Sequence, residues 1–221
     1  MNVTVWGPIV WNFLADVCYR NDRVSDSRIE EYTILFFKSL AFILPCKYCR
    51  QSYRQYFREI DLEDAVKQKS LLAWLWSLHE MVNNKLQKPE SCRIPYCVFA
   101  RRMNCYTHAG SAEHLFDLLG ILGLNYESDD RLKKKYMLIF CSVLPVVIPY
   151  VQFSAILHRQ PLQLQDLSTQ SLYLNWLYSL RQAYNKKIGL PSLPPQQKLW
   201  KKYENAKAGM GTTIIMCDLL P

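Results

Sequence analysis

The feature that most constrains the fold of this chain is an internal repeat. The segment WLWSLHEMVNNKLQKP at 74–89 aligns without gaps to WLYSLRQAYNKKIGLP at 176–191. Seven of the 16 aligned positions are identical: Trp74/Trp176, Leu75/Leu177, Ser77/Ser179, Leu78/Leu180, Asn83/Asn185, Lys85/Lys187 and Pro89/Pro191. A second block lies upstream in the same order, where FILPCKYC at 42–49 aligns with VVIPYVQF at 146–153. We interpret the chain as a duplicated helical unit. The alternative is a chance similarity between two amphipathic helices.

The spacing of apolar residues predicts an all-α fold. Apolar residues recur at helical intervals through long stretches, and only 7 of the 221 residues are glycine. So few glycines argue against the many tight turns of an all-β chain. The expected helices are 6–19, 28–44, 46–57, 71–87 (capped by Ser70), 111–123, 131–148, 150–159 and 169–188. The expected organisation is a four-helix bundle at 1–95, a linker or short fifth helix at 96–110, a degenerate second bundle at 111–195 and a tail at 196–221.

The net charge of +8 is concentrated in the second half. Residues 1–95 hold 13 Lys+Arg and 11 Asp+Glu, whereas residues 96–221 hold the remaining 14 and 8. These basic residues are dispersed, apart from Lys133, Lys134 and Lys135, and no nucleic-acid-binding signature accompanies them. We therefore interpret the excess as a contribution to solubility and expect no nucleic-acid partner.

One stretch is apolar enough to raise the question of a membrane span. Tyr136–Leu157 carries no charge in 22 residues, a sufficient length for a transmembrane helix. Its prolines, Pro145 and Pro149, and its place in the repeat favour two helices of a bundle, so no membrane partner is expected. A membrane-anchored redox protein is the alternative. The first residues resemble neither a signal peptide nor a transit peptide, and this predicts a cytoplasmic location.

The strongest chemical motif is Cys46-Lys47-Tyr48-Cys49, which follows Pro45 at the predicted start of a helix. A helix N-terminus and the cations Lys47 and Arg50 are expected to lower the pKa of a thiol there. Two intervening residues also let a disulfide open and close with little backbone movement. The motif therefore predicts a redox pair. The alternatives are half of a zinc site, completed by Cys92, Cys97, Cys105 or His108, and a buried inert pair.

Two other groups of residues complete the pattern. His79 and Asn83 are four positions apart and share one face of the helix predicted at 71–87. Lys85 and Lys88 lie near the end of that helix, so the group is suited to stacking on a base and holding phosphates, although a solvated polar face is the alternative. Near the N-terminus, Gly7 permits a ligand to approach the backbone closely, between the aromatic residues Trp6 and Trp11.

Together these residues resemble the Erv/ALR family of FAD-linked sulfhydryl oxidases. The matching pattern is W-G-x3-W at 6–11, then P-C-x-x-C at 45–49, then W-x4-H-x2-V-N-x2-L-x-K-P at 74–89. The resemblance covers roughly residues 5–92. It implies a small helical bundle with FAD between the helices and the CxxC beside the flavin ring. The added helical half is a feature of family members from large DNA viruses, which implies a protein of the host cytoplasm and virion.

The resemblance implies an enzyme that makes disulfides in thiol-containing substrate proteins. Cys46 would accept electrons through mixed disulfides, and Cys49 would pass them to FAD and then to oxygen, giving hydrogen peroxide. The residues implied to hold FAD are Gly7, Trp11 and Cys49 at the flavin, and His79, Asn83, Lys85 and Lys88 at the nucleotide. No metal is implied. The alternative is a flavin-free, all-helical module that uses the Cys and His residues to bind zinc or a partner.

Two positions depart from the family pattern. Ala15 stands where the family usually has His, and Glu80 stands where it usually has Asn. Both predict weaker FAD binding. Arg181 replaces His79 in the second copy, so no second FAD is expected there.

The resemblance also bears on assembly and on the other cysteines. Family members pair two bundles as a dimer, which the second half would mimic within one chain, and a homodimer in addition is allowed. A disulfide from Cys92 is implied, with Cys105 or Cys97 as its partner. Cys18 and Cys141 are expected to be buried free thiols, and Cys217 is a candidate shuttle thiol in the tail.

Overall fold

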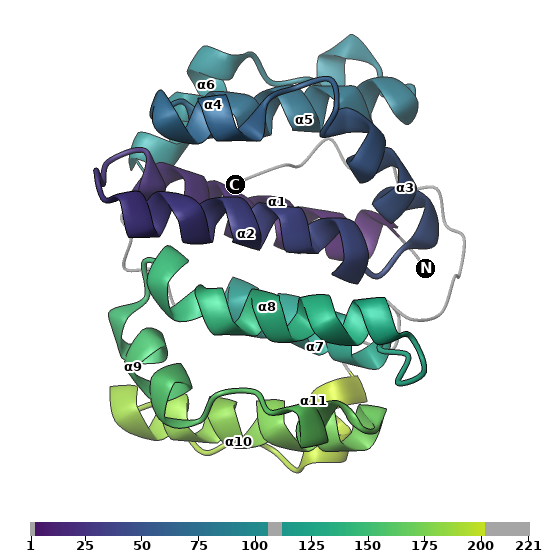
Figure 1. The fold of residues 1–221 in the computed structure, drawn as a ribbon, viewed down its shortest axis with the longest axis vertical. Helices are drawn as coiled ribbons and strands as arrows, with labels where there is room; N and C mark the ends of the chain where they lie inside the picture. Colours follow the sequence, from purple (N-terminus) through teal and green to yellow (C-terminus); the bar gives the residue numbers. More distant parts are fainter. Residues whose placement is uncertain (1–2, 106–111, 202–221) are drawn as a thin grey trace.

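The computed structural model describes residues 3–105 and 112–201, apart from the side chains of residues 3–5, 92 and 102–105. These residues form helices and connecting loops in four layers (Figure 1). The first half contains α1 (Val3–Asn21), α2 (Ser27–Ile43), α3 (Lys47–Tyr56), α4 (Leu62–Lys67), α5 (Leu71–Lys85), η1 (Glu90–Cys92) and α6 (Tyr96–Cys105). The second half contains α7 (Glu113–Leu124), α8 (Arg131–Val147), α9 (Val151–Arg159), η2 (Leu164–Leu167), α10 (Gln170–Ile188) and α11 (Gln196–Lys201).

The predicted all-α class is confirmed, and the expected helices lie within a few residues of those observed. Four short elements, α4, η1, η2 and α11, were not predicted, and α6 occupies most of the segment 96–110, where a linker or short fifth helix was expected. A helix of six residues is too short to show a helical period. For α4 the local signal is instead its cap, since the Asp61 carboxylate accepts the backbone N–H of Asp64 at 3.0 Å.

The prediction that Ser70 caps α5 is wrong. Ser70 precedes the helix, but its side chain makes no capping hydrogen bond. The carboxylate of Asp22 takes that role from the end of α1, accepting the backbone N–H groups of Leu71 and Leu72 at 2.8 and 2.9 Å. An acceptor from a distant segment satisfies the free donors at a helix N-terminus as well as a local cap does.

The two halves share their order of helices and several local details. Asp26 caps α2 and Asp130, 104 residues later, caps α8. The helices then end alike, because Leu44 donates its N–H to the Leu40 carbonyl and Ile148 donates to the Leu144 carbonyl. Asn21 and Asn125 each bind the carbonyl four residues earlier through the side-chain amide. These structural details therefore follow the offset of 104 residues that relates the upstream blocks 42–49 and 146–153.

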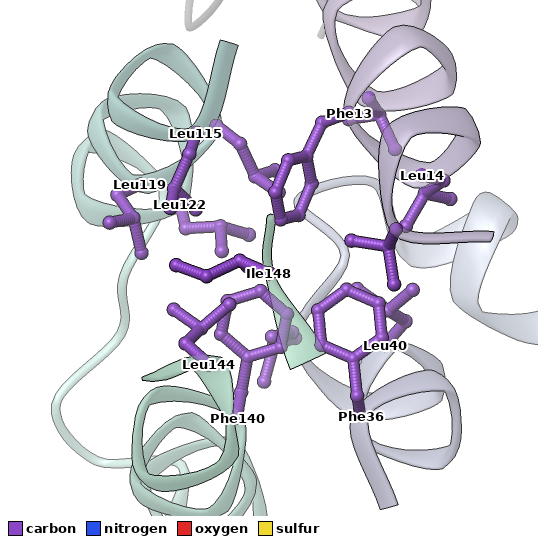
Figure 2. Close-up of a cluster of buried hydrophobic side chains, with 14 of the residues drawn as sticks. Phe13, Leu14, Phe36, Leu40, Leu115, Leu119, Leu122, Phe140, Leu144 and Ile148 are labelled. Atoms are coloured by element: carbon purple, nitrogen blue, oxygen red, sulfur yellow. The ribbon is translucent and has the colours of Figure 1, made fainter. Parts of the chain in front are cut away.

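The halves meet through α1 and α2 on one side and α7 and α8 on the other (Figures 1 and 2). Phe36 of α2 stacks on Phe140 of α8 with ring centroids 5.1 Å apart, and both side chains are fully buried. Figure 2 shows the leucine and phenylalanine side chains of the four helices pointing into this shared core. Polar contacts also cross the seam, such as Asn21 to the Val147 carbonyl at 3.0 Å and Tyr150 to Asp16 at 2.6 Å.

The apolar stretch Tyr136–Leu157 is divided between α8 and α9. The first helix ends at Val147 and the second begins at Val151, with Pro149 between them. The apolar side of α8 is buried against the first half. Of the helices that the structure describes, none combines the length and apolar character that crossing a bilayer requires.

Candidate active site

The two cysteines of the CxxC motif lie at the start of α3. Cys46 is the N-cap of this helix, and its Sγ accepts the backbone N–H of Cys49 at 3.3 Å. Both are free thiols and both are half-buried. Tyr48, between them, is 73% exposed, so the turn that carries the dithiol reaches the surface. This position lets a cysteine of the pair contact another protein.

The dithiol forms part of the wall of a cavity of about 310 Å³, enclosed by α1, α2, α3 and α5. Of the residues predicted from the sequence, Gly7, Trp11, Cys46, Cys49 and Lys85 line this cavity. The rest of the wall is mostly apolar or aromatic: Trp6, Val10, Leu14, Leu40, Leu44, Tyr48, Ser52, Tyr53, Tyr56, Val82 and Leu86. An apolar cavity of this size with a few polar groups is typical of a ligand site.

Several of these lining residues were missed by sequence reasoning. Ser52, Tyr53 and Tyr56 follow Cys49 at helical intervals of three, four and seven residues, so all four share one side of α3. The Tyr53 hydroxyl is buried and donates to the Phe37 carbonyl at 3.0 Å, which fixes the ring in the wall. Their helical spacing from Cys49 is the sequence signal that could have identified them as residues of the cavity wall.

His79 and Asn83 lie beside the cavity rather than in its wall. The His79 ring meets the ring of Trp11 edge to face, with centroids 4.9 Å apart. Asn83 donates its amide to Glu80 Oε1 at 2.7 Å and lies 3.2 Å from His79 Nδ1. If Nδ1 accepts from the amide, the ring proton is on Nε2. His79 Nε2 and Asn83 Oδ1 are both buried without a hydrogen-bond partner, leaving one donor and one acceptor unsatisfied.

Burial, with a smaller contribution from the charge of Lys88, lowers the pKa of His79 to about 4. Glu80 Oε1 lies 3.6 Å from His79 Nδ1, yet burial keeps the pKa of His79 lowered. The neutral ring agrees with an Nδ1 that accepts from Asn83. His79 is therefore suited to aromatic and hydrogen-bonding contacts at neutral pH rather than to holding a phosphate.

The low pKa of His79 predicts a loss of stability in acid. The unfolded chain binds a proton on this ring below about pH 6.5, whereas the folded chain resists it until about pH 4. The free energy of unfolding should therefore fall as the pH is lowered through this window, by roughly 2–3 kcal/mol from this residue. Urea unfolding of the wild type and His79→Gln at pH 7 and pH 4.5 measures it. The variant should lose less stability on acidification, and equal losses in the two proteins would contradict the assignment.

The expectation of a lowered thiol pKa is wrong for Cys49. Burial, with a smaller contribution from the neighbouring Cys46, raises the pKa of Cys49 to about 12. Lys85 and Arg50 act in the opposite direction without overcoming the burial. The helix N-terminus directs its free N–H groups at Cys46 instead, as the contact from the Cys49 N–H shows. In the free dithiol, Cys49 is therefore a protonated thiol at neutral pH.

The remaining predicted residues lie at the end of α5 and just beyond it. Lys85 lines the cavity, and its ammonium group contacts the Ser52 hydroxyl. Lys88 lies outside the wall, and burial lowers its pKa. Glu80, one of the two departures from the family pattern, lies 3.9 Å from Arg93. The other departure, Ala15, is buried in the core.

The other cysteines are placed only in part. Cys18 and Cys141 are fully buried free thiols, and burial raises the pKa of each. Cys97 is an exposed free thiol on α6. The Cys92 and Cys105 side chains, together with His108 and Cys217, lie outside the described residues. Among the His, Cys, Asp and Glu side chains that are described, no three gather in a way that would hold a metal ion.

Aromatic side chains fill the corresponding region of the second half. Phe153 stands 104 residues after Cys49, and Tyr184 stands 102 residues after Val82. Both are buried and pack on Phe116, with ring centroids 5.1 and 5.4 Å away. Arg181, at the position of His79, pairs with Glu113. At these two positions, side chains that line the cavity in the first half are thus replaced by rings that pack together.

Comparison with known proteins agrees with the pattern of this site. Residues 9–103 match the model of the Erv1 / Alr family. A protein named "Probable FAD-linked sulfhydryl oxidase", from Acanthamoeba polyphaga mimivirus, is 30% identical over 87 residues, which cover 38% of this chain and 59% of that protein. The chain thus spans less than two thirds of the length of this relative. No solved structure matches the chain. The segment that runs from α1 into α6 is therefore similar in sequence to the Erv1 / Alr family.

Proposed function

We propose that this chain is an FAD-dependent thiol oxidase that forms disulfides in substrate proteins, with oxygen as the final electron acceptor. The observation that carries the proposal is the position of the Cys46–Cys49 pair, which forms part of the wall of an apolar cavity and also reaches the surface. The pair therefore has access to a protein substrate and to a bound cofactor. The mimivirus relative is named for the same FAD-linked activity.

The residues present fit FAD. The unsatisfied donor on His79 Nε2 and acceptor on Asn83 Oδ1 match an adenine edge, which offers a ring-nitrogen acceptor and an amino donor. Gly7, Trp11 and Cys49 would hold the flavin in the apolar cavity, and Lys85 and Lys88 would hold the phosphates. When bound, FAD supplies a two-electron acceptor for the dithiol and returns the electrons to oxygen, giving hydrogen peroxide.

The two cysteines have different parts in the thiol chemistry. Starting from a Cys46–Cys49 disulfide, a substrate thiolate attacks Cys46 Sγ, forms a mixed disulfide and releases Cys49 as the leaving thiolate. A second substrate thiolate then attacks the substrate sulfur of the mixed disulfide and releases Cys46. The Cys49 N–H bond to Cys46 Sγ stabilises the leaving thiolate of Cys46. The substrate loses two electrons and two protons, and the pair becomes a dithiol.

The test is the visible spectrum of the purified protein, followed by oxygen uptake with dithiothreitol. We expect a flavin band near ~450 nm and one molecule of hydrogen peroxide for each molecule of oxygen consumed. Free FAD at the same concentration is the control. A colourless protein that added FAD does not make active contradicts the proposal. Because Ala15 and Glu80 depart from the family pattern, partial occupancy that added FAD restores is in agreement with it.

A substitution copied from the second half should close the cavity. Val82 lines the cavity, and Tyr184 stands at its counterpart position. Val82→Tyr should weaken FAD binding by about 10- to 100-fold, because placing a larger side chain in filled space costs ~1–3 kcal/mol. Titration of FAD into the variant, followed by fluorescence, measures the loss. Val82→Ala keeps the space open and is the matched control. Equal affinity in the two variants would show that FAD lies elsewhere.

A further inference from the structure

Helix α3 separates the cavity from a second hollow. Cys49, Ser52, Tyr53 and Tyr56 face the cavity. A groove on a different side of the same helix is lined by Lys47 and by the residues three, four and seven positions after it, which are Arg50, Gln51 and Arg54. The redox pair and this groove are therefore held together by one short helix.

The groove lies at the seam between the two halves and has a volume of about 360 Å³. The first half contributes Phe42 from α2 and the polar side of α3. The second half contributes Asp130, Leu132 and Lys133 from the start of α8. Leu132 is 58% exposed and adds an apolar surface to the groove. The family-like half alone would supply only one wall.

The charge of the groove is strongly positive. Its lining contains the four cations Lys47, Arg50, Arg54 and Lys133 but one carboxylate, Asp130. That carboxylate is engaged as the N-cap of α8, where it accepts the Lys133 N–H at 2.9 Å. The lining therefore has a net excess of cations directly beside the dithiol.

Most of these cations have no carboxylate partner within the described part of the chain. Arg50 donates to the carbonyl of Leu44 at 2.5 Å, and Arg54 donates to that of Ala41 at 3.0 Å. Among the described side chains, none of the ion pairs involves Lys47, Arg50 or Arg54. Lys133 lies 3.7 Å from Glu127, and the pKa of Lys133 is lowered mainly by burial but also by Arg50. The groove is thus lined by three cations without a carboxylate partner among the described residues, Lys47, Arg50 and Arg54. The Lys133 side chain is buried, and its ammonium group donates to the Asn125 carbonyl at 2.6 Å.

We propose that this groove binds an acidic segment of the substrate protein, close in sequence to the thiols that the dithiol oxidises. The proposal rests on the proposed function for its substrate. A helix is about 10–12 Å across with its side chains, and an extended chain advances ~3.3 Å per residue. The acidic residues should therefore lie about three or four positions from the reacting cysteine. The exposed Leu132 favours a protein segment, because an apolar side chain of that segment can pack against it. A nucleic acid is also anionic, but its backbone carries neither an apolar side chain nor a thiol that the dithiol could oxidise.

The test compares two dithiol peptides that differ only in charge. The first has four Glu residues, placed three to six positions from a Cys-x-x-Cys pair, and the second has Gln at those positions. At low salt, kcat/KM for the Glu peptide should be at least about tenfold higher, and the difference should disappear in ~0.5 M salt because of screening. Dithiothreitol, which is small and uncharged, should be oxidised at the same rate under both conditions. Equal values for the two peptides at low salt would overturn the proposal.

A matched pair of variants locates the effect. Arg54→Gln should raise KM for the Glu peptide about two- to fivefold, as expected for one exposed charge pair, without changing the values for the Gln peptide or dithiothreitol. Arg58→Gln is the control, because Arg58 is also exposed, is one turn further along, and lines a hollow with Glu59, Asp61 and Glu63. An equal effect of both variants would show general charge attraction rather than binding in the groove.

A binding experiment separates this proposal from the oxidase itself. Fluorescence anisotropy with the Glu peptide, its cysteines replaced by serine, requires no turnover. Binding at low salt that weakens in Arg54→Gln but not in Arg58→Gln supports the groove even if dithiothreitol is not oxidised. Oxidation of dithiothreitol with no peptide binding overturns the groove and leaves the oxidase intact. Displacement of the peptide by an anionic lipid vesicle but not by free glutamate-rich peptide would assign the groove to a membrane surface instead.

Discussion

Replacing Cys49 with serine should reduce the oxidation of dithiothreitol by a factor on the order of 10³ or more, as should replacing Cys46. Each cysteine supplies one sulfur of the disulfide, so neither variant can form it. Both cysteines lie in the wall of the cavity, and serine is similar in size to cysteine, so the substitutions should leave the space in the cavity unchanged. FAD content should therefore stay near that of the wild type. Oxygen uptake and the visible spectrum of the same samples measure the two properties.

The control for this pair is Cys97→Ser. Cys97 is a free thiol, exposed on α6 and outside the cavity wall, and its loss should leave the oxidation of dithiothreitol unchanged. A Cys49→Ser protein that keeps a tenth of the wild-type rate would mean that another thiol reduces the flavin. Loss of colour together with activity would mean instead that the thiol contributes to holding FAD.

Replacing Phe36 with alanine should lower the free energy of unfolding by about 3–5 kcal/mol, as for other large aromatic residues in protein cores. The Phe36 side chain is fully buried and contacts three rings: Phe140 across the seam, Phe37 beside it on α2, and Phe13 of α1. Its removal leaves a cavity where both halves meet. Urea denaturation followed by circular dichroism measures the loss.

Leu35→Ala is the matched control on the same helix. Leu35 is 37% exposed, so its truncation should cost well under half as much as that of Phe36. If Phe36→Ala lowers the free energy of unfolding by less than ~1 kcal/mol, the halves do not depend on this contact for stability. A second unfolding transition in the variant would show that the halves unfold separately once the seam is weakened.

Much of the fold could be predicted because the signals are local. Apolar periodicity located the main helices, and the repeat predicted that the second half would follow the order of the first. What could not be predicted depends on contacts between distant residues. Asp22 caps α5 from 49 positions earlier, and nothing near Ser70 indicates that its own side chain would not cap the helix. The six-residue α4 is likewise stabilised by its cap and its contacts rather than by a pattern.

In the candidate site, too, local motifs could be predicted from the sequence, whereas features that depend on packing could not. The family motifs led to Gly7, Trp11, Cys46, Cys49 and Lys85, which the structure brings to one cavity. The raised pKa of Cys49 was not predicted, since burial depends on how four helices pack and outweighs the nearby cations. The placement of His79 and Asn83 beside the cavity likewise depends on the packing of α5 against α1.

The seam between the halves has a consequence for how the protein responds to dilution. A contact between separate chains loosens as their concentration falls, but α2 and α8 are joined by the same polypeptide. Tethering of this kind gives a local concentration in the millimolar range, whatever the amount of protein present. The groove beside the dithiol, which needs one wall from each half, should therefore remain assembled in a single molecule. The specific activity of the protein toward the Glu peptide should therefore be the same at nanomolar and at micromolar protein concentration.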